Sequence, residues 1–401
     1  MQPPALTLAF DSSARSSAHL APHSSARSAA QPMNIGVLTF HRCINYGSYW
    51  QARLLVQALR NMGHRAVLLD HHSHRVNMAE WRCALQPVLP TPVPPADRKL
   101  YAHKTRKFLA SIASLPLSRP FALENPQGAE AFDAVVVGSD EVWNLAHPWY
   151  GRCPLFFGER IRAKRLVAYA ASFGSYPAGQ GLPQQWASML HNFQSVSVRD
   201  ANSRALLGKA LGHTPELVLD PCLQFAPPPE SGERPRKSGQ APRHVAVYGH
   251  NFSDWFATRM REWARKRNMR LVSIGYRNDW ADTQWLTAGP EDFARFMADA
   301  DAVATNFFHG CVFALRNRKP FLCENSAYRA IKIHDLLFAL GAQHHLADAG
   351  TPASHCDAVL SEALASSVEA RIAALRASSA SYLHHALQEE LDVLARERAH
   401  A

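Results

Sequence analysis

The chain has 401 residues, 47% of them hydrophobic and 19% charged. At roughly 150 residues per domain, this length predicts two or three domains, and the composition excludes a largely disordered chain, a coiled coil and a collagen-like repeat. Apolar runs such as residues 132–137 are short, and none reaches the ~18 residues that a membrane span needs. We therefore expect any membrane contact to be peripheral.

The formal net charge of +10 favours acidic partners, namely anionic lipid head groups, a phosphorylated substrate or nucleic acid. A soluble basic surface explains the charge equally well. Because the charges are spread along the chain and no basic-aromatic motif is present, we expect no nucleic-acid partner. The seven cysteines form no CxxC pair, which argues against a disulfide framework and a structural zinc site. This cysteine usage predicts a cytoplasmic protein.

Residues 1–32 are rich in serine and alanine and lack the apolar core of a secretory signal. We expect a disordered tail here, although an organelle transit peptide has a similar composition. Met33 stands directly before a strand-like run at residues 34–38. Either Met33 is the true start, or the tail is dispensable.

The chain from residue 33 to residue 225 alternates strands and helices. A strand at residues 35–40, an amphipathic helix after the polar loop 41–48 and a second strand at residues 66–69 form a βαβ unit, which predicts a parallel sheet. A Pro-rich stretch at residues 87–95 interrupts regular structure. Further strand-like runs lie at residues 134–137, 166–170, 196–198 and 217–219.

Residues 226–243 contain five prolines and almost no large apolar residue, so they predict an exposed linker and a domain boundary. A second alternation of strands and helices covers residues 244–350. Its expected strands are residues 244–248, 271–274, 302–305 and 321–323, with helices at 254–267, after Pro290 and at 311–317. Leucines spaced through residues 351–401 predict a helical segment that packs back on the body. The pattern predicts an α/β protein with two Rossmann-like domains and a cleft between them.

Polar residues follow several of these strands, and in parallel α/β sheets ligands bind beyond the carboxyl ends of the strands. We therefore expect the two halves to converge on one cleft. The candidates are Asn45, Tyr46, Gly47, Gly138, Ser139, Asp140, Arg199, Asn306, His309 and Gly310.

Several of these candidates have plain structural alternatives. Residues 45–47 form a turn signal in which Gly47 tolerates positive φ, and Ser139 or Asp140 are typical caps of a following segment. Asp200 is a natural N-cap, whereas Arg199 at the strand end points a cation towards the cleft. His309 is expected at the start of a helix, where backbone amides attract an anion.

No metal or nucleotide motif supports another kind of site. Residues 71–74 (HHSH) resemble a metal motif, but no Asp, Glu or Cys stands at ligand spacing, and we interpret them as a solvated loop. Neither GxGxxG nor GxxxxGK[ST] occurs.

Six segments in register resemble the polysaccharide pyruvyl transferase family over about residues 34–345. They are residues 35–41 (IGVLTFH), 44–48 (INYGS), 137–144 (VGSDEVWN), 197–200 (SVRD), 219–221 (LDP) and 305–310 (TNFFHG). The resemblance implies a two-domain fold like that of GT-B glycosyltransferases. It also implies transfer of a pyruvyl group from phosphoenolpyruvate to sugar hydroxyls, usually as a cyclic ketal, in exopolysaccharide or cell-envelope biosynthesis. Phosphoenolpyruvate is then the donor substrate, and no further cofactor is expected.

The residues suit this chemistry. Arg199 and the turn at His309 and Gly310 are expected to bind the carboxylate and phosphate of the donor, and His309 is the expected proton donor. Lys332 stands where the family commonly has an arginine, so it is either a phosphate contact or an exposed helix lysine. The family often has a serine where Phe307 stands, which leaves the acceptor open.

Three interpretations remain. The first is pyruvyl transfer to a glycan or a lipid-linked precursor by a cytoplasmic enzyme, with peripheral contact at the inner membrane face as an option. The second is a GT-B glycosyltransferase that uses a nucleotide sugar. The third is a non-catalytic glycan-binding protein, which would tolerate loss of Arg199 and His309.

Overall fold

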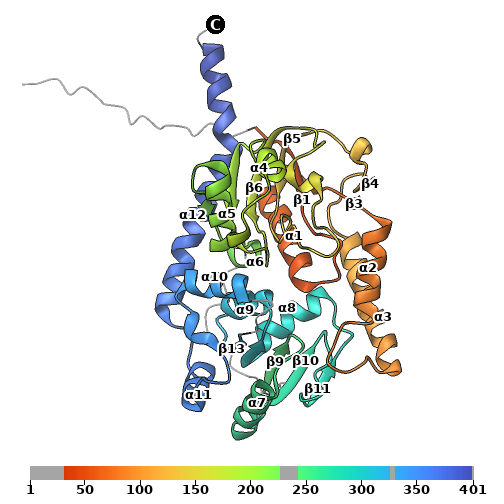
Figure 1. The fold of residues 1–401 in the computed structure, drawn as a ribbon, viewed down its shortest axis with the longest axis vertical. Helices are drawn as coiled ribbons and strands as arrows, with labels where there is room; N and C mark the ends of the chain where they lie inside the picture. The colour runs from red at the N-terminus through yellow and green to blue at the C-terminus, as the bar shows by residue number, and fades with distance from the viewer. Residues whose placement is uncertain (1–30, 226–242, 326–329, 400–401) are drawn as a thin grey trace, which may run out of the picture. The chain divides into compact units, whose positions relative to one another are not determined.

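The computed structural model describes residues 31–225, 243–325 and 330–399, with side chains to residue 388. Two six-stranded sheets, each entirely parallel, organise these residues (Figure 1). The expected tail at residues 1–32 and the expected linker at residues 226–243 lie almost wholly outside the described residues, so both stay predictions.

The first sheet has the strand order β2-β1-β5-β6-β7-β8. Its strands are β1 (Asn34–Leu38), β2 (Arg65–Leu68), β5 (Phe132–Val137), β6 (Ala163–Ala171), β7 (Ser195–Val198) and β8 (Glu216–Leu217). Ile35 of β1 pairs with Ala66 on one side and Ala134 on the other, both in parallel, which confirms the predicted βαβ unit. The side chains of β1 and β5 are almost all buried, as parallel strands covered on both faces require.

The helices of this half are α1 (Tyr46–Asn61), α2 (His74–Leu85), α3 (Pro95–Ala113), α4 (Gln184–Leu190), α5 (Ala201–Leu211) and α6 (Pro221–Gln224). The expectation of a solvated loop at residues 71–74 is wrong. His71 lies in the short strand β3 (His71–His72), which pairs with β4 (Phe121–Ala122), and it is buried. Ser73 accepts a hydrogen bond from the amide of Val76 and so caps α2.

The second sheet has the order β11-β10-β9-β12-β13-β14. Its strands are β9 (His244–Tyr248), β10 (Arg270–Ile274), β11 (Thr283–Trp285), β12 (Ala302–Thr305), β13 (Phe321–Glu324) and β14 (Leu346–Ala347). The helices are α7 (Asp254–Lys266), α8 (Pro290–Asp299), α9 (Phe308–Arg316), α10 (Ala330–Leu340), α11 (Ala353–Ser361) and α12 (Ser366–Ala399). The predicted α/β fold with two Rossmann-like sheets is confirmed.

Both sheets reverse their strand order at the centre. The chain builds outward from β1 to β2 and then returns to place β5 on the other side of β1, and β9 and β12 repeat this pattern. In such sheets the loops after the two central strands diverge and leave a crevice at their carboxyl ends. The loops after β1, β5, β9 and β12 are therefore the places to look for a site.

The last helix returns to the first sheet, as predicted (Figure 1). The hydroxyl of Tyr382 donates to the carbonyl oxygen of Ala168 in β6 at 2.9 Å, and Ser379 Oγ accepts from the amide of Leu219 at 2.9 Å. In the described part of the chain, no helix is long and apolar enough to cross a membrane.

Candidate functional site

A cavity of about 380 Å³ lies at the carboxyl ends of the central strands and is lined by residues of both halves of the chain. It brings together five of the eleven predicted site residues, which come from α1, α9, α10 and the loops after β5 and β7. These five are Asn45, Asp140, Arg199, His309 and Lys332. The two halves therefore meet at one cleft beyond the carboxyl ends of the strands, as the sequence predicts.

The other six predicted residues do not line the cavity; they are Tyr46, Gly47, Gly138, Ser139, Asn306 and Gly310. The Tyr46 side chain instead joins the two halves. It is buried, its hydroxyl donates to the carbonyl oxygen of Ala288 at 2.8 Å, and its ring stacks on Phe293. Asn306 is also buried, and its amide donates to the carbonyl oxygen of His250.

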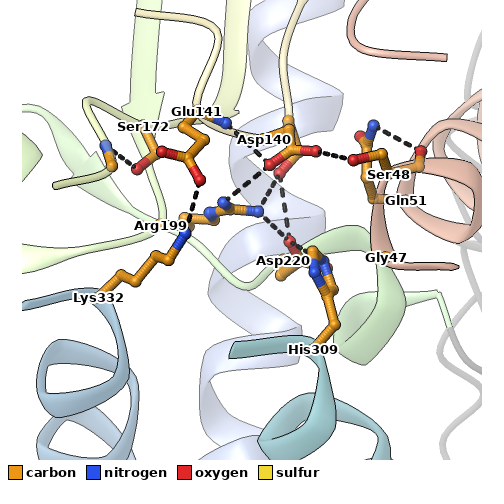
Figure 2. Close-up of polar contacts among 12 residues, drawn as sticks. Gly47, Ser48, Gln51, Asp140, Glu141, Ser172, Arg199, Asp220, His309 and Lys332 are labelled. Atoms are coloured by element: carbon orange, nitrogen blue, oxygen red, sulfur yellow. Dashed lines mark hydrogen bonds and ion pairs between the residues drawn. The ribbon is translucent and has the colours of Figure 1, made fainter. Parts of the chain in front are cut away.

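Arg199 is the centre of a buried ionic network (Figure 2). Its Nη1 donates to Asp220 Oδ2 at 2.6 Å, and its Nη2 donates to Asp140 Oδ1 at 3.2 Å. All three side chains lie just beyond the carboxyl ends of parallel strands, which explains why residues far apart in sequence meet here. The expectation that Arg199 points a free fork towards the cleft is wrong, because protein carboxylates already hold both terminal nitrogens. Asp200 caps α5 through Ser203, as predicted.

Asp220 connects Arg199 to His309. The His309 Nε2 atom lies 3.6 Å from Asp220 Oδ2 and has no hydrogen-bond partner among the described residues. Burial acts to raise the pKa of Asp220, but the facing His309 ring and the Arg199 charge outweigh it and lower that pKa. An ionised carboxylate thus faces the imidazole.

Gly47 leaves the room that the His309 ring needs. A β-carbon at position 47 would overlap Nδ1 and its neighbours in that ring. Gly47 lies within the first turn of α1 and is not among the glycines with positive φ. The structural alternative, a turn in which Gly47 adopts positive φ, is not borne out; the residue is small because an imidazole packs against it. Asn45, as N-cap, accepts hydrogen bonds from the amides of Gly47 and Ser48.

The corner after β5 directs Asp140 to the cavity. Gly138 has φ 111° and Asp140 has φ 72°, and both values are uncommon outside glycine, asparagine and aspartate. Asp140 Oδ2 accepts from Ser48 Oγ at 2.7 Å, and Oδ1 accepts from Arg199. The alternative that Ser139 or Asp140 caps the following segment holds in part, because Asp140 Oδ1 accepts a hydrogen bond from the Glu141 amide at 2.9 Å. Ser139 Oγ instead donates to the carbonyl oxygen of Ala170.

Lys332 reaches the same cavity from α10 and is not an exposed helix lysine. Its ammonium donates to Glu141 Oε1 at 2.5 Å, and both side chains are mostly buried. Burial favours a raised pKa at Glu141, but Lys332 outweighs it and holds the pKa at about 2. Figure 2 shows Lys332 and Arg199 approaching the two adjacent carboxylates, Glu141 and Asp140.

The first turn of α9 opens on the cavity. Its N-cap position is Phe307, and no described side chain accepts hydrogen bonds from the amides of the first turn. Amides at an uncapped helix start attract anions. A β-carbon at Gly310 would overlap the Thr305 side chain, so glycine allows this turn to pack against β12. We call Asp140, Glu141, Arg199, His309 and Lys332, with Asp220 behind them, the paired wall.

A second group of residues that line the cavity, here called the aromatic wall, consists of Glu80, Lys104, His250 and Tyr276. The Lys104 ammonium donates to the carbonyl oxygen of Gly275 at 2.8 Å and lies 4.8 Å from the centre of the Tyr276 ring. Burial lowers the pKa of Lys104 to about 7. Burial also raises the pKa of Glu80 to about 7, against a hydrogen bond from the Ile44 amide.

Sequence reasoning missed Glu80 and Lys104 because it considered only loops after strands, and it passed over His250 and Tyr276, which do lie in the loops after β9 and β10. Glu80 and Lys104 belong to helices. A signal was present, since Lys104 shares its helical face with Tyr101 and Phe108, three residues before and four after, and both are fully buried. A charged residue on an apolar helix face marks a buried charge.

Asp220, Cys222 and His309 offer three ligand atoms within 4.8 Å of one another, which is a possible metal-binding arrangement. The donors do not fit a cation well. Arg199 already binds Asp220, and burial raises the pKa of the Cys222 thiol well above its usual value, which keeps it protonated. The arrangement suits proton transfer at His309 better than metal binding.

Similar solved structures are distant. The chain matches a UDP-GlcNAc 2-epimerase from Neisseria meningitidis bound to UDP-GlcNAc at 11% identity and a TM-score of 0.44, over 90% of this chain and 99% of that one. It matches a Streptomyces glycosyltransferase complexed with thymidine diphosphate at 14% identity and a TM-score of 0.40, over 87% and 96%. No curated protein matches the chain in sequence.

The family comparison is decisive instead. The model of the polysaccharide pyruvyl transferase family matches residues 45–327, which is more than half of the chain. The matched region contains the corner after β5, Arg199, Asp220 and the first turn of α9 with His309. The chain therefore belongs to the polysaccharide pyruvyl transferase family.

Proposed function

We propose that this protein transfers the pyruvyl group of phosphoenolpyruvate to hydroxyls of a cell-surface polysaccharide or its precursor and forms a ketal. The observation that carries the proposal is the pairing of His309 with an ionised Asp220 in a cavity that also holds Lys332 and the uncapped start of α9. This combination supplies a proton donor next to binding groups for an anion.

The donor carries a phosphate and a carboxylate on adjacent positions of a three-carbon enol. The amides of the first turn of α9 suit the phosphate, and the Lys332 ammonium suits a second anionic group. Arg199 fixes Asp220 and Asp140 rather than binding the donor with a free fork. Its charge offsets these two carboxylates, which would otherwise repel an anionic donor.

The chemistry needs one proton donor and one proton acceptor. A proton from His309 adds to the methylene carbon of the donor, and an acceptor hydroxyl oxygen forms a bond to the enol carbon while its own proton leaves to a base. A second acceptor hydroxyl then attacks the same carbon, the bond to the phosphate oxygen breaks, and that hydroxyl's proton leaves with inorganic phosphate. The product is a cyclic ketal that bears a methyl group and a carboxylate. Asp220 stabilises the imidazolium that gives the first proton.

The test combines binding with turnover in the full chain. We expect phosphoenolpyruvate to raise the thermal unfolding midpoint by mass action, and His309→Asn to keep this rise. The same variant should release phosphate from phosphoenolpyruvate and acceptor at least ~100-fold more slowly, because general acid catalysis contributes this much or more.

The outcomes separate the alternatives. A midpoint that rises with nucleotide sugars and not with phosphoenolpyruvate would replace pyruvyl transfer by glycosyl transfer. A His309→Asn variant with full turnover would exclude His309 as the acid. Binding of glycans without any turnover, unaffected by loss of Arg199 and His309, would favour a non-catalytic role.

A further inference from the structure

Helices α2 and α3 and the loop between them, here called the α2–α3 hairpin, expose an unusual set of apolar side chains. Seven large hydrophobic side chains are exposed in the described part of the chain, and five of them lie in this hairpin. The five are Met78, Trp81, Val88, Leu100 and Leu109. Exposed apolar groups concentrated in one region mark an interaction surface. Figure 1 shows α2 and α3 side by side.

The exposed charged side chains of the hairpin are all cationic. Its only two carboxylates are buried, because Glu80 lines the cavity and Asp97 pairs with Arg277. The exposed cations are Arg75, Arg82, Arg98, Lys99 and Arg106. Apart from Arg75, whose guanidinium donates to the carbonyl oxygen of Trp149, they contact no described carboxylate or carbonyl group. The partner of this surface must therefore be negatively charged and must accept apolar side chains.

The hairpin also forms part of the cavity. Cys83, Ala84, Pro87 and Val88, at the end of α2 and in the following loop, line it together with His309 and Lys332. A partner that binds the hairpin thus lies next to the cavity. An anionic lipid surface meets each condition, since its head groups attract cations and its interface accepts tryptophan and aliphatic side chains.

We propose that the α2–α3 hairpin docks on an anionic membrane surface and presents the cavity to an acceptor held at that surface by a lipid. The docking rests on the exposed side chains alone. The lipid-linked acceptor rests in addition on the proposed pyruvyl transfer. Exposed apolar side chains interspersed with cations favour an anionic lipid surface over a second copy of this chain, because the cations of two hairpins would repel each other.

The experiment measures binding of the full chain to vesicles by sedimentation. We expect binding to vesicles of phosphatidylcholine and phosphatidylglycerol in equal parts, and much weaker binding to phosphatidylcholine alone. The double variant Arg82→Gln with Lys99→Gln should lower the partition coefficient for the anionic vesicles by about tenfold or more. Met78→Ser with Trp81→Ser should lower it as well, because both side chains lose their place in the interface.

Matched controls come from other exposed positions. Arg261→Gln with Arg265→Gln changes two exposed cations of α7, and Phe338→Ser removes an exposed phenylalanine of α10. The docking proposal is overturned if the wild type ignores anionic vesicles or if these controls weaken binding as much as the hairpin variants. It is also overturned if the hairpin variants abolish self-association instead.

Thermal stabilisation by phosphoenolpyruvate separates this proposal from the proposed function. None of the four hairpin residues changed here lines the cavity, so all variants should keep the wild-type midpoint and its rise with phosphoenolpyruvate. Vesicle binding without any such rise would leave the docking standing and refute the donor. A rise of the midpoint with phosphoenolpyruvate, without vesicle binding, would support the donor and refute the docking.

Discussion

The two walls of the cavity differ in whether their buried cations are paired with carboxylates. On the paired wall each cation has its own carboxylate: Arg199 binds Asp140 and Asp220, and Lys332 binds Glu141. On the aromatic wall Lys104 donates to a carbonyl oxygen and lies over tyrosine rings, and no described carboxylate pairs with it.

This difference changes how each wall responds to pH. Opposite charges in contact favour the ionised form, so the cations of the paired wall hold the pKa values of Asp220 and Glu141 below their usual range. Burial without a partner disfavours the charged form, and it brings the pKa of both Lys104 and Glu80 to about 7. One wall is a fixed electrostatic frame, and the other changes its charge near neutrality.

Breaking the frame should have the largest effect. Arg199→Met leaves Asp140 and Asp220 as buried carboxylates without a cation, and we expect a loss of about 3–5 kcal/mol in the free energy of unfolding. Denaturant titration measures it. The control Arg204→Met removes an exposed arginine of the same region and should cost less than ~1 kcal/mol. Equal losses would mean that the paired wall is not a stabilising frame.

A substitution that crowds the His309 ring should have the second-largest effect. Gly47→Ala places a β-carbon where the imidazole lies, so the ring must move, and turnover should fall up to ~100-fold. Gly208→Ala in α5 is the control, because nothing lies within 4 Å of its added carbon, and a helical Gly→Ala change there should stabilise the fold by about 0.5–1 kcal/mol. Unchanged turnover in Gly47→Ala would contradict the role of His309 as the proton donor.

Much of this frame follows from the sequence, and the rest does not. The strand runs at β1, β5, β9 and β12 were predicted because buried parallel strands are continuous apolar runs. The loops after β5, β7 and β12 therefore gave Asp140, Arg199 and His309. The sequence could not show that Arg199 would form ion pairs with Asp140 and Asp220, because these pairings depend on the order of strands in the sheet.

The Lys104 ammonium should make stability depend on pH. Its pKa is lowered from 10.5 to about 7, so between these values the unfolded chain binds the proton and the folded chain does not. This contribution to stability is fully present above pH 10.5 and is lost as pH falls through about 7. Unfolding titrations should show that wild type gains stability relative to Lys104→Met as pH rises from 7 towards 10.5.

The Glu80 carboxyl should give a smaller effect of opposite direction. Its pKa is raised from 4.5 to about 7, so the folded chain keeps a proton that the unfolded chain releases. This contribution is present below pH 4.5 and is lost as pH rises through about 7. Relative to Glu80→Gln, wild type should lose stability over that range. A flat difference would show that the carboxyl is solvated and that the aromatic wall does not change its charge.

The return of α12 to the first sheet has a consequence for how the molecule is made. The Leu219 amide and the Ala168 carbonyl group find their partners in Ser379 and Tyr382, which leave the ribosome more than a hundred residues later. Domains generally fold from the N-terminus as synthesis proceeds. Here the first sheet stays incomplete until nearly the whole chain has emerged, so premature termination should yield a product that chaperones and proteases recognise as unfinished.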